Sequence, residues 1–273
     1  MLVVLVLLGL AGHFLTVLFT FVLHFYDTTS RGGRPPQPLA TYASAFVGDW
    51  WFSLAYLLSF LPGYLPSKRL AANRANGGPP ILLVHGFLLN RACMFAIYWR
   101  LRRQGYRHVY TVNLDPIFGP LQTMTENLSP RIREIAGHHN RPVHVVAHSM
   151  GGVVLRKCIH HDPSLPVAGV ITLGTPHHGS GIANFGLSAA AREMRPGSTL
   201  LGTLPETPSV PFTSIYSLVD NMVLPSDSAM FGQRMIQFTD VGHISLMYSQ
   251  RVFDAILGEL PGVEDVDVRR ESA

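Results

Sequence analysis

The chain has 273 residues, enough for one sizeable domain and an appendage, and its net charge is +4. Only 14% of the residues are charged and 47% are hydrophobic. Because soluble domains are about 25% charged, part of the chain is expected to face a membrane. The basic residues form no run with interleaved aromatic residues, which argues against nucleic-acid binding. Cys93 and Cys158 lie far apart and no metal-binding or dinucleotide motif occurs, so we predict no disulfide framework, metal or cofactor.

Residues 2–26 contain no Asp, Glu, Lys or Arg. As a helix this segment would be about 37 Å long, against about 30 Å of bilayer hydrocarbon. We therefore predict a transmembrane anchor over residues 1–27. A cleaved signal peptide is the alternative, but no basic residue precedes the apolar run and no A-x-A site ends it.

Residues 28–77 are expected to be linker with an embedded apolar segment. Residues 27–37 and 66–80 are linkers by composition, whereas residues 43–65 are apolar and aromatic. Asp49 and Pro62 argue against a plain second span, so we favour a helix at the membrane interface or docked on a domain. A second membrane span is the alternative.

From residue 78 to residue 262 the pattern alternates between strand and helix. Strands are predicted at 81–84, 108–112, 143–147, 167–173, 214–219 and 235–238. Helices are predicted at 91–104, 122–138, 150–161 and 245–257. Continuous apolar strands alternating with helices predict an α/β fold, a mostly parallel sheet covered on both faces. Residues 179–208 are a candidate short cap, and residues 263–273 a flexible charged tail.

A serine stands where the third predicted strand turns into a helix. Residues 143–152 read V-H-V-V-A-H-S-M-G-G, with Ser149 at the turn. Strand, sharp turn and helix, with small residues two before and two after the serine (Ala147 and Gly151), are typical of a nucleophile elbow. A serine in an ordinary strand-to-helix turn is the alternative.

A serine hydroxyl needs a base and an orienting acid before it can attack a carbonyl. The loops at the carboxyl ends of parallel strands meet at one edge, so distant residues can converge there. His243, between the last strand and the last helix, is the candidate base, chosen by position among 13 histidines. Asp220, directly after the penultimate strand, is the candidate acid; Asp240 and Asp115 are the less favoured rivals.

Two backbone amides are candidates for binding the oxyanion of a tetrahedral intermediate. One is the amide of Met150, at the start of the helix after the serine. The other is the amide of Phe87, next to the flexible Gly86 in the loop after the first strand. Such a donor typically lowers a barrier by about 3 kcal/mol.

Three motifs occur in order: L-V-H-G-F at 83–87, V-A-H-S-M-G-G at 146–152 and L-G-T-P-H-H-G-S at 173–180. With the segments around Asp220 and His243, they resemble the α/β-hydrolase lipases, most of all bacterial triacylglycerol lipases and esterases. The resemblance covers residues 80–260 and implies an α/β-hydrolase catalytic domain. It implies a triad and two oxyanion amides at Ser149, Asp220, His243, Phe87 and Met150. The residues that we expect to line the substrate site are His85, Gly86, Leu88, His148 and His178.

These observations predict a membrane-anchored serine carboxylester hydrolase that cleaves lipid-like acyl esters through an acyl-serine. An acyltransferase or a phospholipase would use the same residues, so the sequence does not separate them. A non-catalytic membrane protein with this fold is the third hypothesis. Basic residues follow the first apolar segment and none precedes it, which predicts a cytoplasm-facing domain. The resemblance to exported lipases favours the opposite side.

Overall fold

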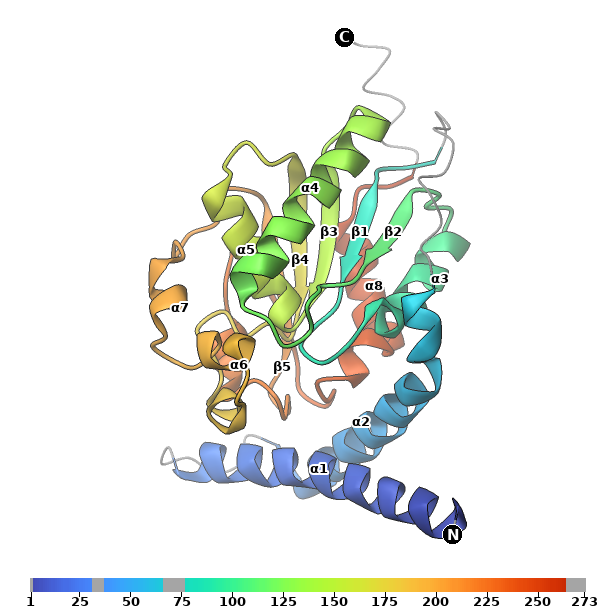
Figure 1. The fold of residues 1–273 in the computed structure, drawn as a ribbon, viewed down its shortest axis with the longest axis vertical. Coiled ribbons are helices and arrows are strands. Elements are labelled where there is room, and N and C mark those ends of the chain that lie inside the picture. Colours follow the sequence, from blue (N-terminus) through green and yellow to red (C-terminus); the bar gives the residue numbers. More distant parts are fainter. Residues whose placement is uncertain (1, 31–36, 66–76, 264–273) are drawn as a thin grey trace.

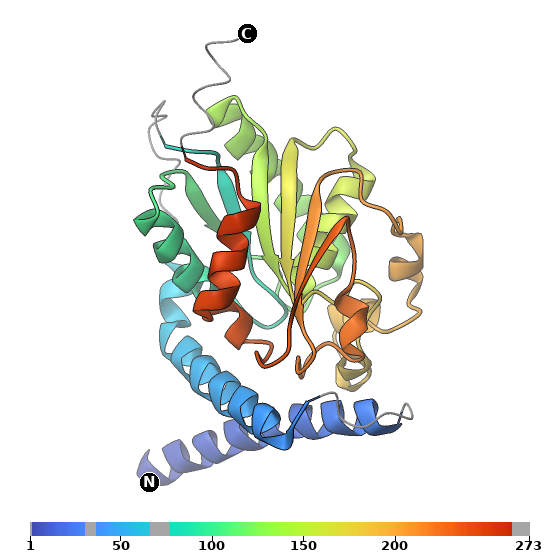
Figure 2. The same ribbon diagram turned by 180° about the vertical axis from the view of Figure 1, so that it is seen from behind.

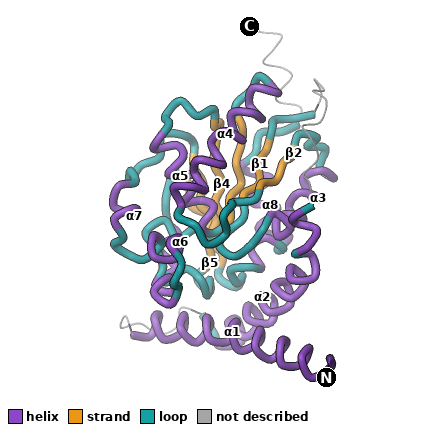
Figure 3. Tube along the Cα trace, viewed as in Figure 1, coloured by secondary structure: helices purple, strands orange, loops and turns teal. Residues whose placement is uncertain are grey.

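The computed structural model describes residues 2–30, 37–65 and 77–263 (Figure 1). Most of the two predicted linkers and nearly all of the predicted tail lie outside the described residues. Within these residues, the chain forms one sheet with helices on both faces. A pair of N-terminal helices lies at the carboxyl ends of the strands (Figures 1 and 3).

The sheet has six strands in the order β2-β1-β3-β4-β5-β6, and every neighbouring pair is parallel. The strands are β1 (Ile81–Val84), β2 (Val109–Val112), β3 (Val143–His148), β4 (Val167–Leu173), β5 (Phe212–Ser217) and β6 (Arg234–Phe238). This topology confirms the predicted α/β fold class. Because β1 lies between β2 and β3, the chain reverses its direction of travel across the sheet there, which is where such sheets place their sites.

Helices cover both faces of the sheet. α4 (Leu121–His139) and α5 (Met150–His161) lie on one face, and α3 (Phe95–Arg103) and α8 (Gln250–Glu259) lie on the other (Figures 1 and 2). Leu82 and Val84 of β1 belong to the apolar cluster that includes α4 and α5. Ile81 and Leu83 belong to the cluster that includes α3 and α8. Successive side chains of a strand point to opposite faces, so a strand buried on both must be apolar throughout.

Most predicted boundaries agree with the structure to within two residues, and the helix predicted at residues 91–104 begins as the short helix η2 (Arg91–Met94) before α3. Two differences have a clear local cause. β5 ends at Ser217, not at residue 219, because the chain turns there and the Ser217 hydroxyl accepts the Val219 amide at 3.4 Å. The predicted continuous helix over residues 245–257 is wrong. It divides into the short helix η5 (Ser245–Met247) and α8, because the Ser249 side chain caps a new helix by accepting the Val252 amide.

Residues 179–208, the predicted cap, contain the short helices η3 (Gly181–Phe185), α6 (Ala189–Glu193) and α7 (Thr199–Thr203). A serine side chain caps the start of each helix. Figure 1 shows α6 beside the carboxyl end of the sheet. Two further short helices, η2 (Arg91–Met94) and η4 (Ser226–Ala229), lie in other connections.

The N-terminal segment forms α1 (Leu2–Ser30), α2 (Leu39–Ser59) and η1 (Leu61–Tyr64). α1 lies across the carboxyl edge of the sheet, and α2 runs from it towards α3 (Figures 1 and 2). Within the described residues, Leu7–Ser30 is one helical stretch long and apolar enough to cross a membrane. Polar contacts dock these helices on the domain. The Tyr56 hydroxyl accepts the Asn90 amide at 2.8 Å, and Arg91 Nε donates to the Gly63 carbonyl at 2.9 Å.

Candidate active site

The three residues predicted to form a relay follow three different strands. Ser149 comes directly after β3, Asp220 follows β5 and His243 follows β6. All strands are parallel, so their carboxyl ends lie at one edge, where the connecting loops gather (Figure 3). The sheet thus brings together side chains up to 94 positions apart in the sequence.

Ser149 has a strained backbone with φ 54° and ψ −130°. Such a conformation costs a non-glycine residue about 1–3 kcal/mol and persists only when its surroundings fix it. The Ser149 amide donates to the Leu173 carbonyl at 2.9 Å. A methyl group on Gly151 would lie 2.5 Å from the His85 carbonyl oxygen, so the elbow requires glycine there. These features match the sharp turn that the sequence predicts.

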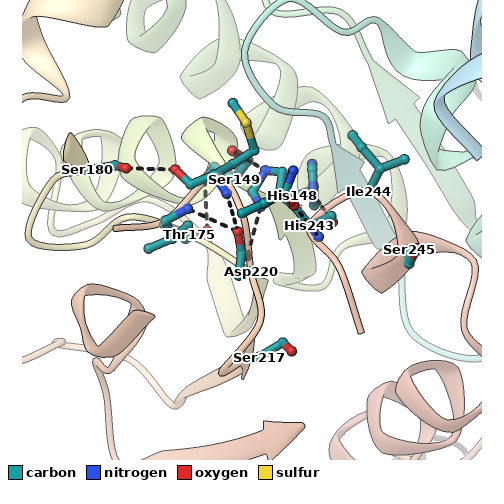
Figure 4. Close-up of polar contacts among 12 residues, drawn as sticks. His148, Ser149, Thr175, Ser180, Ser217, Asp220, His243, Ile244 and Ser245 are labelled. Carbon is teal, nitrogen blue, oxygen red and sulfur yellow. Dashed lines mark hydrogen bonds and ion pairs between the residues drawn. The ribbon is translucent and has the colours of Figure 1, made fainter. Parts of the chain in front are cut away.

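Hydrogen bonds connect the three side chains in one line (Figure 4). Ser149 Oγ lies 3.0 Å from His243 Nε2, and His243 Nδ1 lies 2.8 Å from Asp220 Oδ2. The other carboxylate oxygen of Asp220 accepts the amides of Met222 at 2.8 Å and Val223 at 3.0 Å. This fixes the carboxylate, which in turn fixes the imidazole with its Nε2 lone pair towards Ser149. The rival acid Asp240 instead pairs with Arg251 on the surface.

The surroundings of His243 favour its charged form. Burial would lower the pKa of the imidazole, but the carboxylates of Asp220 and Asp49 outweigh it, so the pKa is raised above its usual 6.5. The Asp220 carboxylate raises the pKa both by its charge and by the 2.8 Å hydrogen bond that Oδ2 accepts from His243 Nδ1. An imidazole in this setting can take a proton from Ser149 and hold the resulting charge.

The candidate oxyanion amides flank Ser149. Met150 is the first residue of α5, where a helical amide has no acceptor within its own helix. On the other side, a methyl group on Gly86 would lie 2.7 Å from Ser149 Cβ, so the loop that carries Phe87 passes directly over the serine. His85 holds this loop: its Nδ1 donates to the Gly86 carbonyl and its Nε2 accepts the Leu114 amide, each at 2.8 Å.

Two of the histidines expected to line the substrate site, His85 and His148, have buried side chains. They are 1% and 0% exposed. Burial lowers the pKa of His85 to about 4 and that of His148 well below its usual value, so both are neutral at pH 7. His148 Nε2 donates to the His243 carbonyl at 3.2 Å. The contacts of both rings support loops at the site, and that they line the substrate site stays a prediction. Leu88 is exposed. His178 is also largely exposed, and its Nε2 donates to the Met230 carbonyl.

Sequence reasoning missed three residues that contact the relay or the loop that carries His243. The Thr175 hydroxyl donates to the Ser149 carbonyl at 2.8 Å. Gly174 has φ 53°, and a methyl group there would lie 2.7 Å from Asp220 Oδ2. Both residues lie in the L-G-T-P-H-H-G-S motif, which could have indicated them. Asp49 of α2 contacts the backbone beside His243, and its only signal is a lone carboxylate in an apolar segment.

A six-stranded parallel sheet with helices on both faces and a strained serine at its switch point defines the α/β-hydrolase class. The model of the "Alpha/beta hydrolase family" matches residues 81–241, more than half of the chain, and the protein therefore belongs to this family. The match falls inside the domain predicted at residues 78–262.

Similar solved structures have the same fold. Aspergillus fumigatus lipase B has a TM-score of 0.62 at 20% identity, covering 71% of this chain and 56% of that one. Bacillus licheniformis lipase BlEst2 in its mature form has a TM-score of 0.60 at 20% identity, covering 72% and 98%. A structure described under LipS and LipT, two metagenome-derived lipolytic enzymes, has a TM-score of 0.54 at 14% identity, covering 69% and 96%. This chain thus spans little more than half of the fungal lipase and nearly all of the bacterial one.

Proposed function

We propose that the protein is a serine carboxylester hydrolase of the lipase and esterase type, with Ser149, His243 and Asp220 as its triad. The observation that carries this proposal is the line of hydrogen bonds from Ser149 Oγ through the His243 ring to Asp220 Oδ2. The strained backbone of Ser149 and the two flanking amides of Phe87 and Met150 support it.

In the proposed reaction, Ser149 Oγ attacks the ester carbonyl carbon while His243 Nε2 takes the hydroxyl proton. The carbonyl oxygen becomes an oxyanion, and the amides of Phe87 and Met150 bind it. His243 then gives its proton to the oxygen of the leaving alcohol as the ester bond breaks. The alcohol departs, and the acyl group remains bound to Ser149. Water, deprotonated by the same imidazole, attacks the acyl carbon. The imidazolium then returns the proton to Ser149 Oγ as the bond between the acyl carbon and Oγ breaks and the acid leaves. Asp220 holds the Nδ1 proton and stabilises the imidazolium at each step.

The substrate class that we propose is acyl esters of lipid character. Phe185 and Leu187, at 62% and 86% exposure, belong to the segment 179–208 beside the site edge. Phe19 of α1 packs edge-to-face on Phe185, with ring centroids 5.6 Å apart. An exposed apolar surface thus continues from the segment to α1, and such a surface suits an acyl chain. The similar structures named lipases and lipolytic enzymes support the same class.

A fluorophosphonate probe is expected to form a covalent adduct on Ser149, because the probe needs a hydroxyl activated by a base. Mass spectrometry of the digested protein locates the adduct, and Ser149→Ala is expected to abolish it. Ser180→Ala is the matched control, because the Ser180 hydroxyl donates to the Met222 carbonyl instead of to a histidine. Labelling that persists at full rate in Ser149→Ala would reject the proposed nucleophile.

We also propose that α1 and α2 attach the protein to a membrane surface, with α1 lying along it. Residues 13–25 of α1 lie within the contact with α2: His13 bonds to Ser53 at 2.9 Å and Phe25 packs on Tyr42. Residues 2–12, about 16 Å of helix, extend beyond these contacts at one end and residues 26–30 at the other. Each piece is too short for about 30 Å of hydrocarbon. In this proposal the helix lies on the membrane, in place of the transmembrane anchor that the sequence predicts. It also argues against a cleaved signal peptide, because Phe21 packs in the cluster with Val219.

Replacing exposed apolar residues of α2 by aspartate is expected to weaken membrane binding. Trp51 and Leu58 are 60% and 83% exposed. Each apolar side chain buried in lipid contributes about 1.5–3 kcal/mol, so the double variant Trp51→Asp/Leu58→Asp should lower the partition coefficient on phosphatidylcholine vesicles at least about tenfold. The measurement is flotation of the full chain with vesicles. The matched control Trp99→Asp/Met235→Asp alters residues of α3 and β6 that are 59% and 47% exposed. Equal losses in both double variants would contradict the proposed surface.

A further inference from the structure

Asp49 of α2 binds the backbone next to His243. One carboxylate oxygen accepts the Ser245 amide at 2.8 Å and the Ser245 hydroxyl at 2.6 Å. The other accepts the Ile244 amide at 3.2 Å. The Asp49 side chain is 1% exposed. The three donors therefore supply the hydrogen bonds that water would give to an exposed carboxylate. The carboxylate thus holds the two residues that directly follow His243.

Glycines let the helix and the loop come this close. A methyl group on Gly242, the residue before His243, would lie 2.4 Å from Asp49 Cγ. A methyl group on Gly48, beside Asp49, would lie 3.0 Å from Ser245 Oγ. Residues on both sides of His243 are therefore packed against the Asp49 carboxylate.

α1 reaches the same loop by a second route. Asn221, the neighbour of Asp220, donates from its Nδ2 to Thr20 Oγ1 of α1 at 2.7 Å. The Asn221 side-chain oxygen accepts the His243 amide at 3.3 Å. Both N-terminal helices thus bind the segments that carry the acid and the base, 195 to 201 positions away in the sequence.

We propose that Asp49 is a positioning residue for the base, an inference that rests on the proposed function. Its carboxylate fixes the backbone of the 242–245 loop, so that the His243 imidazole stays in line between Asp220 and Ser149. It also adds a second negative charge near the imidazolium that forms when Ser149 is deprotonated. The N-terminal helix pair is then part of the active site, and detaching α2 from the domain inactivates the enzyme.

The charged groups around His243 set the sign of the expected pH effect. Asp220 from the loop after β5 and Asp49 from α2 raise the pKa of His243, and the neutral ring of His148 from β3 packs beside it. Burial raises the pKa of Asp49 itself to about 6, against the donors from Ser245 and the charge of His243. At neutral pH Asp49 is therefore mostly ionised. Removing its charge lowers the pKa of His243.

The decisive variant is Asp49→Asn, which keeps the size of the side chain and one acceptor but removes the charge and the acceptor for Ile244. We expect kcat for a soluble p-nitrophenyl ester to fall at least about tenfold, with KM changed less than about twofold. We expect the acid limb of kcat/KM to shift downward by roughly 0.5 pH unit or more, because free His243 then loses its proton at lower pH. A merely structural role would not move this limb.

The matched control is Asp240→Asn, which removes an exposed carboxylate three positions before His243 that pairs with Arg251. Its kcat and acid limb should equal those of the wild type. Ser245→Ala removes one hydrogen bond from Asp49 but no charge. It should lower kcat less than Asp49→Asn does, because the Asp49 carboxylate keeps its charge at neutral pH and the amide donors of Ile244 and Ser245.

Two results would overturn the proposal: wild-type kcat in Asp49→Asn, or a lowered kcat with an unmoved acid limb. If Asp49→Asn does not fold, the wild-type enzyme decides. Protonation of both His243 and Asp49 should make log kcat/KM fall with a slope above 1 below pH 6, and a slope of 1 would count against Asp49. Full ester hydrolysis in Ser149→Ala would instead remove the proposed function, whatever Asp49 does.

Discussion

Replacement of His243 by alanine is expected to lower kcat for a p-nitrophenyl ester by roughly 10⁴-fold or more. Without the imidazole, Ser149 Oγ has no base within reach, because the hydrogen bond from Ser149 to His243 Nε2 at 3.0 Å is lost. The neighbouring ring of His148 does not replace it, since its Nε2 donates to the backbone of residue 243 and burial lowers its pKa, which makes it a weak base. The residual rate should come from the oxyanion amides and substrate binding, and steady-state kinetics measures the difference.

His160→Ala is the matched control, because His160 is an exposed histidine in the last turn of α5. It should keep the wild-type kcat. Circular dichroism melts should show cooperative unfolding for both variants, because His243 lies in a loop and belongs to neither apolar cluster. A His243→Ala enzyme within tenfold of wild-type kcat would mean that another group accepts the serine proton.

Most of the sheet could be predicted because the strands β1 to β5 are mostly buried, whereas β6 is largely exposed. Ile81–Val84 is apolar at every position. A short apolar run between turn residues predicts a buried strand. The position of Ser149 followed from the small residues that a sharp turn between strand and helix demands. Asp220 and His243 followed from the parallel topology, because residues that directly follow parallel strands share one edge. In each case a local rule of backbone geometry carried the inference.

The contacts of the N-terminal helices could not be predicted in this way. The apolar composition of residues 2–26 records only that the helix avoids water, and lipid or a protein surface satisfies that equally. Asp49 looks like an argument against a membrane span, but its actual partners are backbone amides 195 and 196 positions away. Backbone amides have no sequence signature. The break at Ser249 was missed for a similar reason, since a cap is seen only once the chain direction is known.

Asp220→Asn is expected to lower kcat by about 10⁴-fold while the fold persists, because the substitution reverses a tautomer. In the wild type, Oδ1 accepts the amides of Met222 and Val223, and Oδ2 accepts the Nδ1 proton of His243. An asparagine must keep its oxygen on the two amides, because its NH₂ group would otherwise face two donors. The NH₂ group then points at His243 Nδ1, which becomes an acceptor.

The imidazole proton consequently moves to Nε2, where it points at Ser149 Oγ and leaves no lone pair to take the hydroxyl proton. The expected kinetic signature is a large loss of kcat with little change in KM, and a much slower fluorophosphonate reaction at Ser149. Asp240→Asn again serves as the control, since it removes a carboxylate nearby that has no contact with the ring. If Asp220→Asn kept wild-type labelling and kcat, then Asp220 would only hold the Met222–Val223 turn. Some other carboxylate would have to orient His243, and Asp49 would be the one nearest to its loop.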